Sequence, residues 1–311
     1  MLYDNANIAY GFYECYNSIV DKINLKAPAK INLYLRVKDK RPDGYHNIDS
    51  LMQTVSLYDE LTLEKSSDIE LYCSSLDDIK TEDNLAYRAA RLVAEMTYFP
   101  GVQINLKKSI PIGAGLAGGS SDAAFVIRGL IKLYGLSFDR GELIKRASLL
   151  GADVPLFLGH GQARVSGIGD KIEDYFLPLN YKVLIVKPPF SIKTAEAYRW
   201  LDISRESKPS LRTSEDLVFL NKRVTDSRFI HFAGQFFNDF EEVVFSKYPQ
   251  LSQIKQSLKE EGAFYAGMSG SGSAVFGLFP PACDLEKKAE KFYDTQTRVY
   301  MCKPVLLAPA G

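Results

Sequence analysis

A glycine-rich stretch in the first half of the chain, PIGAGLAGGSSDAA (111–124), constrains the fold more than any other feature. Glycine lets the backbone bend into positive φ and lets N–H groups approach a ligand without a Cβ in the way. The stretch leads into AAFVIRGLIKLYG, a predicted buried helix ending at Gly135, with Ser120, Ser121 and Asp122 as candidate N-caps. Such a loop gathers free N–H donors at the positive end of the helix dipole. The sequence therefore predicts a phosphate site here rather than a simple tight turn.

Two familiar phosphate-binding patterns do not fit this stretch. The chain has no G-x-x-x-x-G-K-[ST] sequence, so it lacks a Walker loop. Gly113, Gly115 and Gly118 satisfy G-x-G-x-x-G, but a dinucleotide site also needs a buried parallel strand before the glycines. The preceding VQINLKK alternates apolar and polar residues, which is typical of a half-exposed antiparallel strand, and Pro111 interrupts the approach. The next acidic candidate, Asp139, begins a helix instead of ending a strand, which excludes NAD.

The composition of the chain limits the kinds of partner that we expect it to bind. The 311 residues are enough for one large or two moderate domains, and no internal repeat is present. The 38 basic and 38 acidic residues give a formal net charge of +0, without the basic footprint that nucleic acid requires. The three histidines are too far apart in sequence to predict a metal site. We expect reduced, unpaired cysteines at all four positions: Cys15, Cys73, Cys283 and Cys302.

The first residues, up to about 22, form a tyrosine-rich leader to which we assign no function. It carries acidic residues and no long apolar core, so it does not resemble a signal peptide. No stretch is long enough to cross a membrane. We therefore expect a soluble, cytoplasmic protein without membrane or nucleic-acid partners, a monomer or weak homodimer.

The order of the elements before the glycine-rich stretch is strand, turn, strand and helix. Residues 23–40 alternate as a strand does, and the turn that follows places Tyr45 and His46 side by side. A second strand starts near residue 49, with Asp59 and Glu60 expected to break it. The segment 81–97 is predicted to be helical, capped by Thr81 or Asp83.

Two later segments leave their function open. In GADVP, Asp153 lies between a helix end and a proline, so its carboxylate is either a solvated turn residue, which the segment alone favours, or an aimed catalytic group. The second glycine loop, MSGSGS (268–273), is either a plain connector or a backbone wall that closes on a substrate. From the apolar strand YKVLIVKPP onward, the alternation of strands and helices indicates an α+β split-βαβ domain.

Four stretches in one order, APAKINLYL, PIGAGLAGGSSDAA, GADVP and MSGSGSAVF, resemble the GHMP kinases. The resemblance runs from about residue 25 to the C-terminus. It implies a two-domain α+β fold, with a ribosomal-protein-S5-domain-2-like domain over 1–178 (leader 1–22 included) and a ferredoxin-like domain over 179–311. Finer matches, such as RPDGYHNIDSLMQ and EDNLAYRAA, are similar to the branch that phosphorylates 4-(cytidine 5′-diphospho)-2-C-methyl-D-erythritol in the non-mevalonate isoprenoid pathway. The cofactors implied are ATP and Mg²⁺.

The resemblance also assigns residues to roles. It implies a catalytic pair, Lys30 and Asp153. The residues expected to hold ATP are Asn84, Leu85, Lys108, Pro111, Ile112, Gly113, Ala114, Gly115, Leu116, Ala117, Gly118, Gly119, Ser120 and Ser121. The residues expected to hold the alcohol substrate are Asn32, Tyr45, His46, Asp153, Tyr198 and Gly270. Ala117 occupies a position that is often glycine in this family, and we expect little cost from its methyl group.

The implied chemistry is phosphoryl transfer, which depends mostly on positioning and charge stabilisation. Asp153, beside Lys30, would accept or orient the proton of the substrate hydroxyl. Tyr45 and Tyr198 would sandwich the cytosine ring while His46 hydrogen-bonds its edge. Taken singly, each of these residues is more often a solvated or core residue, and only their joint order favours the site. Two alternatives remain, another small-alcohol kinase of the same superfamily, such as a homoserine or mevalonate kinase, or a non-catalytic S5-like RNA-binding module.

Overall fold

The computed structural model describes residues 20–73, 80–207, 224–294 and 296–310. Most of the predicted leader, with Cys15, lies outside these ranges. Cys73, Cys283 and Cys302 are free, as predicted for the three cysteines that can be seen. No helix in the described ranges combines the length and apolar character needed to cross a membrane.

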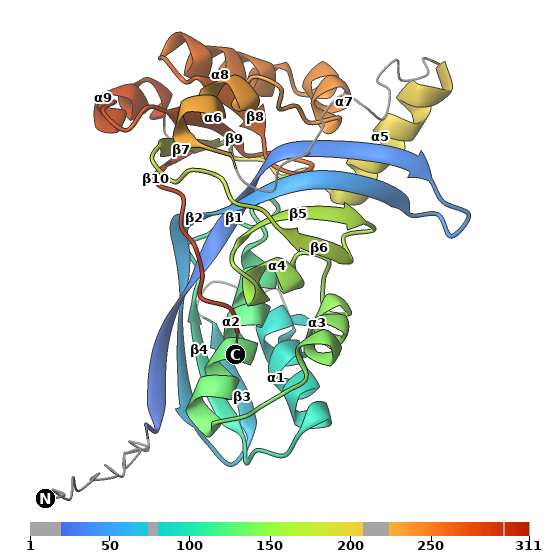
Figure 1. Ribbon diagram of the computed structural model, residues 1–311, viewed down its shortest axis with the longest axis vertical. Helices are drawn as coiled ribbons and strands as arrows, with labels where there is room; N and C mark the ends of the chain where they lie inside the picture. Colours follow the sequence, from blue (N-terminus) through green and yellow to red (C-terminus); the bar gives the residue numbers. More distant parts are fainter. Residues whose placement is uncertain (1–19, 74–79, 208–223, 295, 311) are drawn as a thin grey trace, which may run out of the picture.

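The first half of the chain forms a six-stranded sheet. A long hairpin of β1 (Lys22–Lys40) and β2 (His46–Lys65) runs through the molecule (Figure 1). The other strands are β3 (Ile69–Cys73), β4 (Val102–Lys107), β5 (Gln162–Gly167) and β6 (Lys171–Asp174). Together with β2 they lie in the order β3-β4-β2-β5-β6, and β1 pairs with β2 alone. β4 is antiparallel to β2 but parallel to β3, so the predicted antiparallel pairing holds on one side only. Its residues alternate between buried and more exposed positions, as predicted, and do not form the fully buried parallel strand that a dinucleotide fold needs.

The predicted break at Asp59 and Glu60 is wrong, because β2 continues through both residues. Asp59 is fully buried, and its Oδ1 accepts hydrogen bonds from the backbone N–H groups of Ser109 and Ile110 at 2.5 and 2.8 Å. A carboxylate with such donors can be buried inside a strand. Asp59 therefore ties β2 to the segment that enters the glycine-rich stretch.

Helices cover one face of this sheet: the 3₁₀ turn η1 (Thr81–Asp83), α1 (Leu85–Met96), α2 (Gly118–Tyr134), α3 (Arg140–Ser148) and α4 (Val154–Leu158) (Figure 1). Apolar side chains of the sheet and of α2 meet in a buried core, as expected for the predicted buried helix. The cap of α1 is Asn84, whose side chain accepts from the Ala86 N–H at 2.9 Å, and not Thr81 or Asp83 as predicted. Those two residues already belong to η1.

The second half forms a separate antiparallel sheet in the order β10-β7-β9-β8. Its strands are β7 (Lys182–Lys187), β8 (Tyr265–Met268), β9 (Val275–Phe279) and β10 (Arg298–Cys302). The helical elements are α5 (Thr194–Ser207), α6 (Asp226–Ala233), α7 (Phe240–Lys247), α8 (Pro249–Glu260), α9 (Leu285–Ala289) and η2 (Glu290–Phe292). This order confirms the split-βαβ, ferredoxin-like prediction.

The end of the chain returns from β10 to the first sheet and lies beside α2 (Figure 1). The Val305 N–H donates to the Thr54 carbonyl at 3.0 Å, and the Ser56 N–H donates to the Lys303 carbonyl at 2.9 Å. The two sheets are consecutive in sequence, yet this last segment packs on the first of them. The division at residues 178 and 179 stays a prediction.

Candidate active site

The glycine loop enters α2 earlier than predicted. The helix begins at Gly118, and its N-cap is Ala117, which has φ 55° and makes no side-chain cap hydrogen bond. The prediction that Ser120, Ser121 or Asp122 caps the helix is therefore wrong, since all three already lie within the helix. The left-handed turn at Ala117 brings the chain into the helix before the serines are reached.

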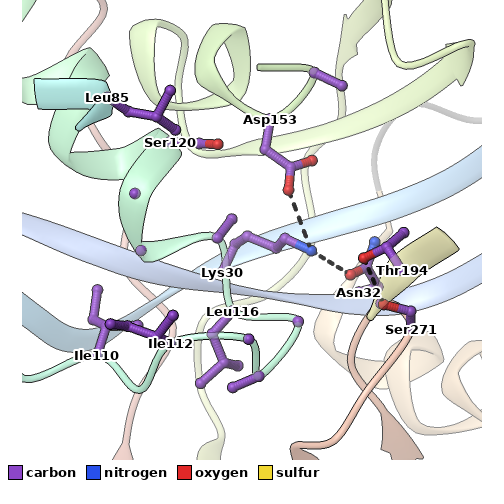
Figure 2. A pocket seen from close by; sticks show the side chains of 18 of the residues that line it. Lys30, Asn32, Leu85, Ile110, Ile112, Leu116, Ser120, Asp153, Thr194 and Ser271 are labelled. Carbon is purple, nitrogen blue, oxygen red and sulfur yellow. Dashed lines mark hydrogen bonds and ion pairs between the residues drawn. The ribbon is translucent and has the colours of Figure 1, made fainter. Parts of the chain in front are cut away.

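A cavity of about 540 Å³ opens at the end of this loop. Most of the residues predicted for the site line its wall, namely Lys30, Asn32, Asn84, Leu85, Lys108, Asp153, Tyr198, Gly270 and every loop residue from Pro111 to Ser120. Figure 2 shows Lys30 and Asp153 facing each other, with Ser120, Ile112 and Leu116 of the loop segment around them. Three predicted residues, Ser121, Tyr45 and His46, are not part of this wall. Segments distant in sequence thus form one pocket around the glycine loop.

Lys30 lies at the centre of the pocket. It belongs to β1 and is only 3% exposed, and its backbone N–H donates to the Leu116 carbonyl of the glycine loop at 3.1 Å. Its Nζ donates to Asn32 Oδ1 at 2.5 Å and lies 3.6 Å from Asp153 Oδ2 (Figure 2). A buried ammonium needs such partners. The strand therefore holds a cation where a phosphoryl group at the loop would meet an acceptor oxygen.

Asp153 precedes α4, with Pro155 in the first turn of that helix. Its side chain makes no capping hydrogen bond, and its carboxylate faces Lys30 instead. The GADVP segment is thus a helix start and not only a turn. The sequence left open whether Asp153 is a solvated turn residue or a catalytic group aimed at a site, and the geometry favours the catalytic group.

The second glycine loop closes the pocket from the other sheet. Ser269 Oγ donates to the Gly115 carbonyl at 2.8 Å, and the Ala274 N–H donates to the Ala114 carbonyl at 3.1 Å. A Cβ added to Gly115, which has φ +77°, would lie 2.0 Å from the Ser269 carbonyl oxygen. MSGSGS is therefore a wall of the cavity, and Gly115 must be glycine for the loops to approach so closely.

Lys108 has two acidic partners that the sequence did not indicate. Its Nζ pairs with Asp59 and, at 2.5 Å, with Asp122 Oδ2. Burial raises the pKa of Asp122 to about 7, and the Asp59 carboxylate adds to this while Lys108 opposes it. The sequence predicted a strand break at Asp59 and a helix cap at Asp122. Neither prediction indicated that these residues pair with Lys108.

The aromatic residues predicted for the substrate lie at the tip of the β1–β2 hairpin and on α5. The His46 ring stacks on Tyr198, with centroids 4.9 Å apart and planes 21° apart. Burial, and then the nearby Asp153 carboxylate, raises the pKa of Tyr198. Tyr45 is 65% exposed beside them. Sequence reasoning missed Asp202, whose Oδ1 lies 2.7 Å from His46 Nε2.

Comparisons with known proteins agree with this geometry. Residues 84–161 match the family of GHMP kinases N terminal domains, and residues 227–295 match GHMP kinases C terminal. A 4-diphosphocytidyl-2-C-methyl-D-erythritol kinase of Prosthecochloris aestuarii is 40% identical over 278 residues, covering 89% of this chain and 96% of that protein. The one of Caldicellulosiruptor saccharolyticus is 41% identical over 270 residues, covering 86% and 91%.

Solved structures give the same result. A crystal structure of 4-(cytidine 5′-diphospho)-2C-methyl-D-erythritol kinase has 33% identity and a TM-score of 0.74, covering 91% of this chain and 99% of that one. A homoserine kinase from Cytophaga hutchinsonii has a TM-score of 0.71 over 94% of this chain and 97% of its own, but only 19% identity. The latter likeness therefore concerns the fold alone.

With both family domains matched around the joined glycine loops, this chain is a GHMP kinase and hence a phosphotransferase. The similarity is finer than the superfamily, because about 40% identity extends over most of the chain. The chain belongs to the 4-diphosphocytidyl-2-C-methyl-D-erythritol kinase family. The resemblance stated from the motifs is confirmed, and neither alternative is favoured.

Proposed function

We propose that the protein transfers the γ-phosphoryl group of ATP to the 2-hydroxyl of 4-(cytidine 5′-diphospho)-2-C-methyl-D-erythritol, in the pocket between the two sheets. The observation that carries the proposal is the position of Lys30, buried against the glycine loop and 3.6 Å from the Asp153 carboxylate. This places a cation and an acidic group beside a loop suited to phosphates. The names of the relatives supply the substrate.

The glycine loop would hold the triphosphate. Its free N–H groups and the N-terminus of α2 line the pocket and favour negative charge. Asn84 and Leu85, at the start of α1, line the same wall and would contact the nucleotide. The positive charge of Lys108 is already paired with Asp59 and Asp122. Lys108 would therefore position the glycine loop more than it would neutralise a phosphate.

Asp153 would orient the acceptor hydroxyl and take its proton late in the transfer, since a loose transition state requires little early deprotonation. Lys30 would stabilise charge on the transferring group, and Asn32 keeps Lys30 in place through the 2.5 Å hydrogen bond. The Gly270 region of the second glycine loop would close on the substrate from the other sheet.

The residues at the loop also suit Mg²⁺, the ion implied for this family. Magnesium prefers oxygen ligands and is usually held by substrate phosphates with one or two carboxylates. Asp122 lines the pocket, and its Oδ1 is a buried oxygen without a hydrogen-bond partner in the described ranges, so this carboxylate would hold the ion. Within those ranges no cluster of three or more His, Cys, Asp or Glu residues forms a separate metal site. Bound there, the ion would neutralise charge on the phosphates.

The cytosine base would stack against Tyr45. The 4.9 Å contact between His46 and Tyr198 leaves no room for a ring between them, because stacked layers lie roughly 3.5 Å apart. The base would therefore stack on Tyr45 and turn its edge toward His46, while Tyr198 supports the His46 ring from its other side. One chain supplies all these groups, which supports a monomer or weak homodimer, and the free described cysteines suit the cytoplasm.

An ADP-release assay with three alcohols tests this function. Purified protein with ATP and Mg²⁺ should release ADP with the cytidine diphosphate alcohol and show only background with homoserine or mevalonate. Turnover of homoserine or mevalonate, with none of the cytidine substrate, would overturn the assignment. Salt-dependent RNA binding without turnover of any alcohol would instead favour a binding module.

A further inference from the structure

Helix α5 holds the tip of the β1–β2 hairpin through a carboxylate one turn beyond Tyr198. Asp202 Oδ1 lies 2.7 Å from His46 Nε2, and Oδ2 accepts from Lys40 Nζ at 2.7 Å. One turn further on, Arg205 Nη2 donates to the Val37 carbonyl at 2.8 Å. The hairpin tip lies next to α5 (Figure 1). The helix thus binds both strands of the hairpin and fixes His46 just after its turn.

The chemistry of these contacts decides where the hydrogen lies on His46. Lys40 can only donate and an ionised carboxylate can only accept, so the imidazole must donate from Nε2. Burial works against the charge of Asp202, but the hydrogen bonds from Lys40 and His46 hold its pKa below the usual value, so it is ionised. In the neutral ring, a hydrogen on Nε2 leaves Nδ1 as an acceptor. No hydrogen bond to Nδ1 is found among the described residues.

The ring has little freedom to turn over. The His46 side chain is 6% exposed and lies against Tyr198. A flipped ring would put the Cε1–H group against the carboxylate in place of Nε2 and forfeit the bond to Asp202. The orientation and the tautomer are therefore set together by one residue on α5.

Cytosine and uracil differ at the group such an acceptor would meet. Cytosine carries an exocyclic amine, a donor, at the position where uracil carries a carbonyl oxygen, an acceptor. An Nδ1 acceptor favours the first and repels the second. A site that hydrogen-bonds a donor rejects the analogue lacking it far more strongly than an apolar site does.

We propose that Asp202 is the positioning residue of the base subsite: it fixes His46 as the Nε2–H tautomer, so that Nδ1 accepts from the exocyclic amine and selects cytosine over uracil. The proposal rests on the proposed function for the identity of the base and for its contact with His46. Asp202 acts through His46 and does not touch the substrate.

The decisive variant is Asp202→Asn at pH 8, where an ordinary imidazole is neutral. Lys40 needs the single amide oxygen, so the amide NH₂ would face His46 Nε2 and move the ring hydrogen to Nδ1. We expect kcat/KM for the cytidine substrate to fall by about tenfold or more, with kcat and the KM for ATP nearly unchanged. Activity with the matching uridine diphosphate alcohol should rise relative to the cytidine substrate.

Two matched variants separate tautomer control from simple anchoring of the hairpin. Lys40→Met removes the ion pair but leaves the carboxylate on His46, so base preference should be unchanged. In Lys40→Met/Asp202→Asn the amide oxygen is free to turn to His46, and the preference for cytosine should return in part. If Asp202 only anchors the hairpin, the double variant should prefer cytosine less than either single variant does. That result would overturn the proposal.

Two measurements remain valid even if the proposed reaction is wrong. ¹⁵N NMR of the imidazole should show hydrogen on Nε2 of His46 in the parent protein and on Nδ1 in Asp202→Asn. Calorimetry should show that CMP binds more tightly than UMP in the parent, and that this difference shrinks in Asp202→Asn. An Nδ1–H ring in the parent, or an unchanged CMP-to-UMP ratio in the variant, overturns the proposal. Failure of the three-alcohol assay with these results intact would instead reject the reaction.

Discussion

Ala117 is the residue at which the glycine loop becomes a helix, and it occupies a conformation that suits glycine better. Its φ of 55° lies in the left-handed region, where a Cβ costs about 1–2 kcal/mol. The small side chain keeps this cost modest. The sequence expectation that a methyl is tolerated here concerns the size of the group, whereas the structure shows that the cost is one of backbone conformation.

We predict that Ala117→Gly raises the free energy of unfolding by up to about 1 kcal/mol, because relief of strain slightly exceeds the added freedom of the unfolded chain. Urea unfolding of the two proteins measures the difference. Activity should be preserved, since the change removes only a methyl group and leaves the backbone N–H groups of the loop in place. A loss of stability of 1 kcal/mol or more would show that the methyl contributes packing that outweighs the strain.

Asp122 gives the fold a pH dependence. Its pKa is raised from the usual 3.8 to about 7, so between these values the folded state binds more protons than the unfolded one. This contribution to stability is present below the lower value and is lost as pH rises through the higher one. From pH 5 to pH 8, Asp122→Asn should therefore lose less stability than the parent protein, by about 1 kcal/mol or more. Urea unfolding at both pH values measures this, and equal losses would contradict it.

At the scale of elements, the two glycine loops are the contact between the sheets that shapes the pocket. The Gly115 carbonyl accepts a hydrogen bond from Ser269 of the second loop, and the Ala114 carbonyl accepts one from Ala274, which directly follows that loop. Because Gly115 approaches the Ser269 backbone so closely, the loops cannot separate without moving the phosphate site. Rigid backbone contacts of this kind suit a reaction that depends on positioning.

Gly115→Ala should therefore reduce kcat/KM by about tenfold to a hundredfold, since a displacement near 1 Å at the reacting groups has effects of this size. Gly135→Ala is the matched control. It has a similar φ of +63° but nothing within 4 Å of an added Cβ, so it should lose stability by about 1 kcal/mol and keep its activity. Steady-state kinetics on both variants distinguish loop displacement from backbone strain, and equal activity would contradict the account.

The sequence predicted these elements better than it predicted their ends. Periodicity and glycine spacing indicated the β1–β2 hairpin, α2 and the split-βαβ order, because those signals are local. The predicted caps of α1 and α2 were wrong. Asn84 caps α1 with a side-chain oxygen that several nearby polar residues could equally have supplied, and Ala117 enters α2 through backbone geometry alone. The strand break at Asp59 was wrong because its partners lie about fifty residues away in sequence.

At the scale of the whole molecule, the pocket forms only when both sheets are joined. Lys30 comes from the first strand, Asp153 precedes a short helix much later, and Tyr198 belongs to the second unit. Their order in the chain allowed the family to be predicted from motifs. Distances between them could not be, and neither could Asp202, because a lone aspartate on a helix carries no sequence signal.

The return of the C-terminal segment to the first sheet is another feature that only tertiary structure reveals. Val305 and Leu307 donate to the Thr54 and His160 carbonyls, so the second unit is attached to the first at both of its ends. This restrains how the two sheets move relative to each other. The pocket is therefore held by the loop contact on one side and by the terminal segment on the other.

The most direct test of the account is Asp153→Asn, measured for kcat with the cytidine substrate and for ATP affinity by calorimetry. The side chain keeps its size but can no longer take a proton, so kcat should fall by about 10²- to 10⁴-fold. The Kd for ATP should stay within about twofold, because the loop amides and not Asp153 hold the triphosphate. Undiminished turnover would remove Asp153 from the mechanism, and a collapse of ATP affinity together with kcat would assign it to nucleotide binding instead.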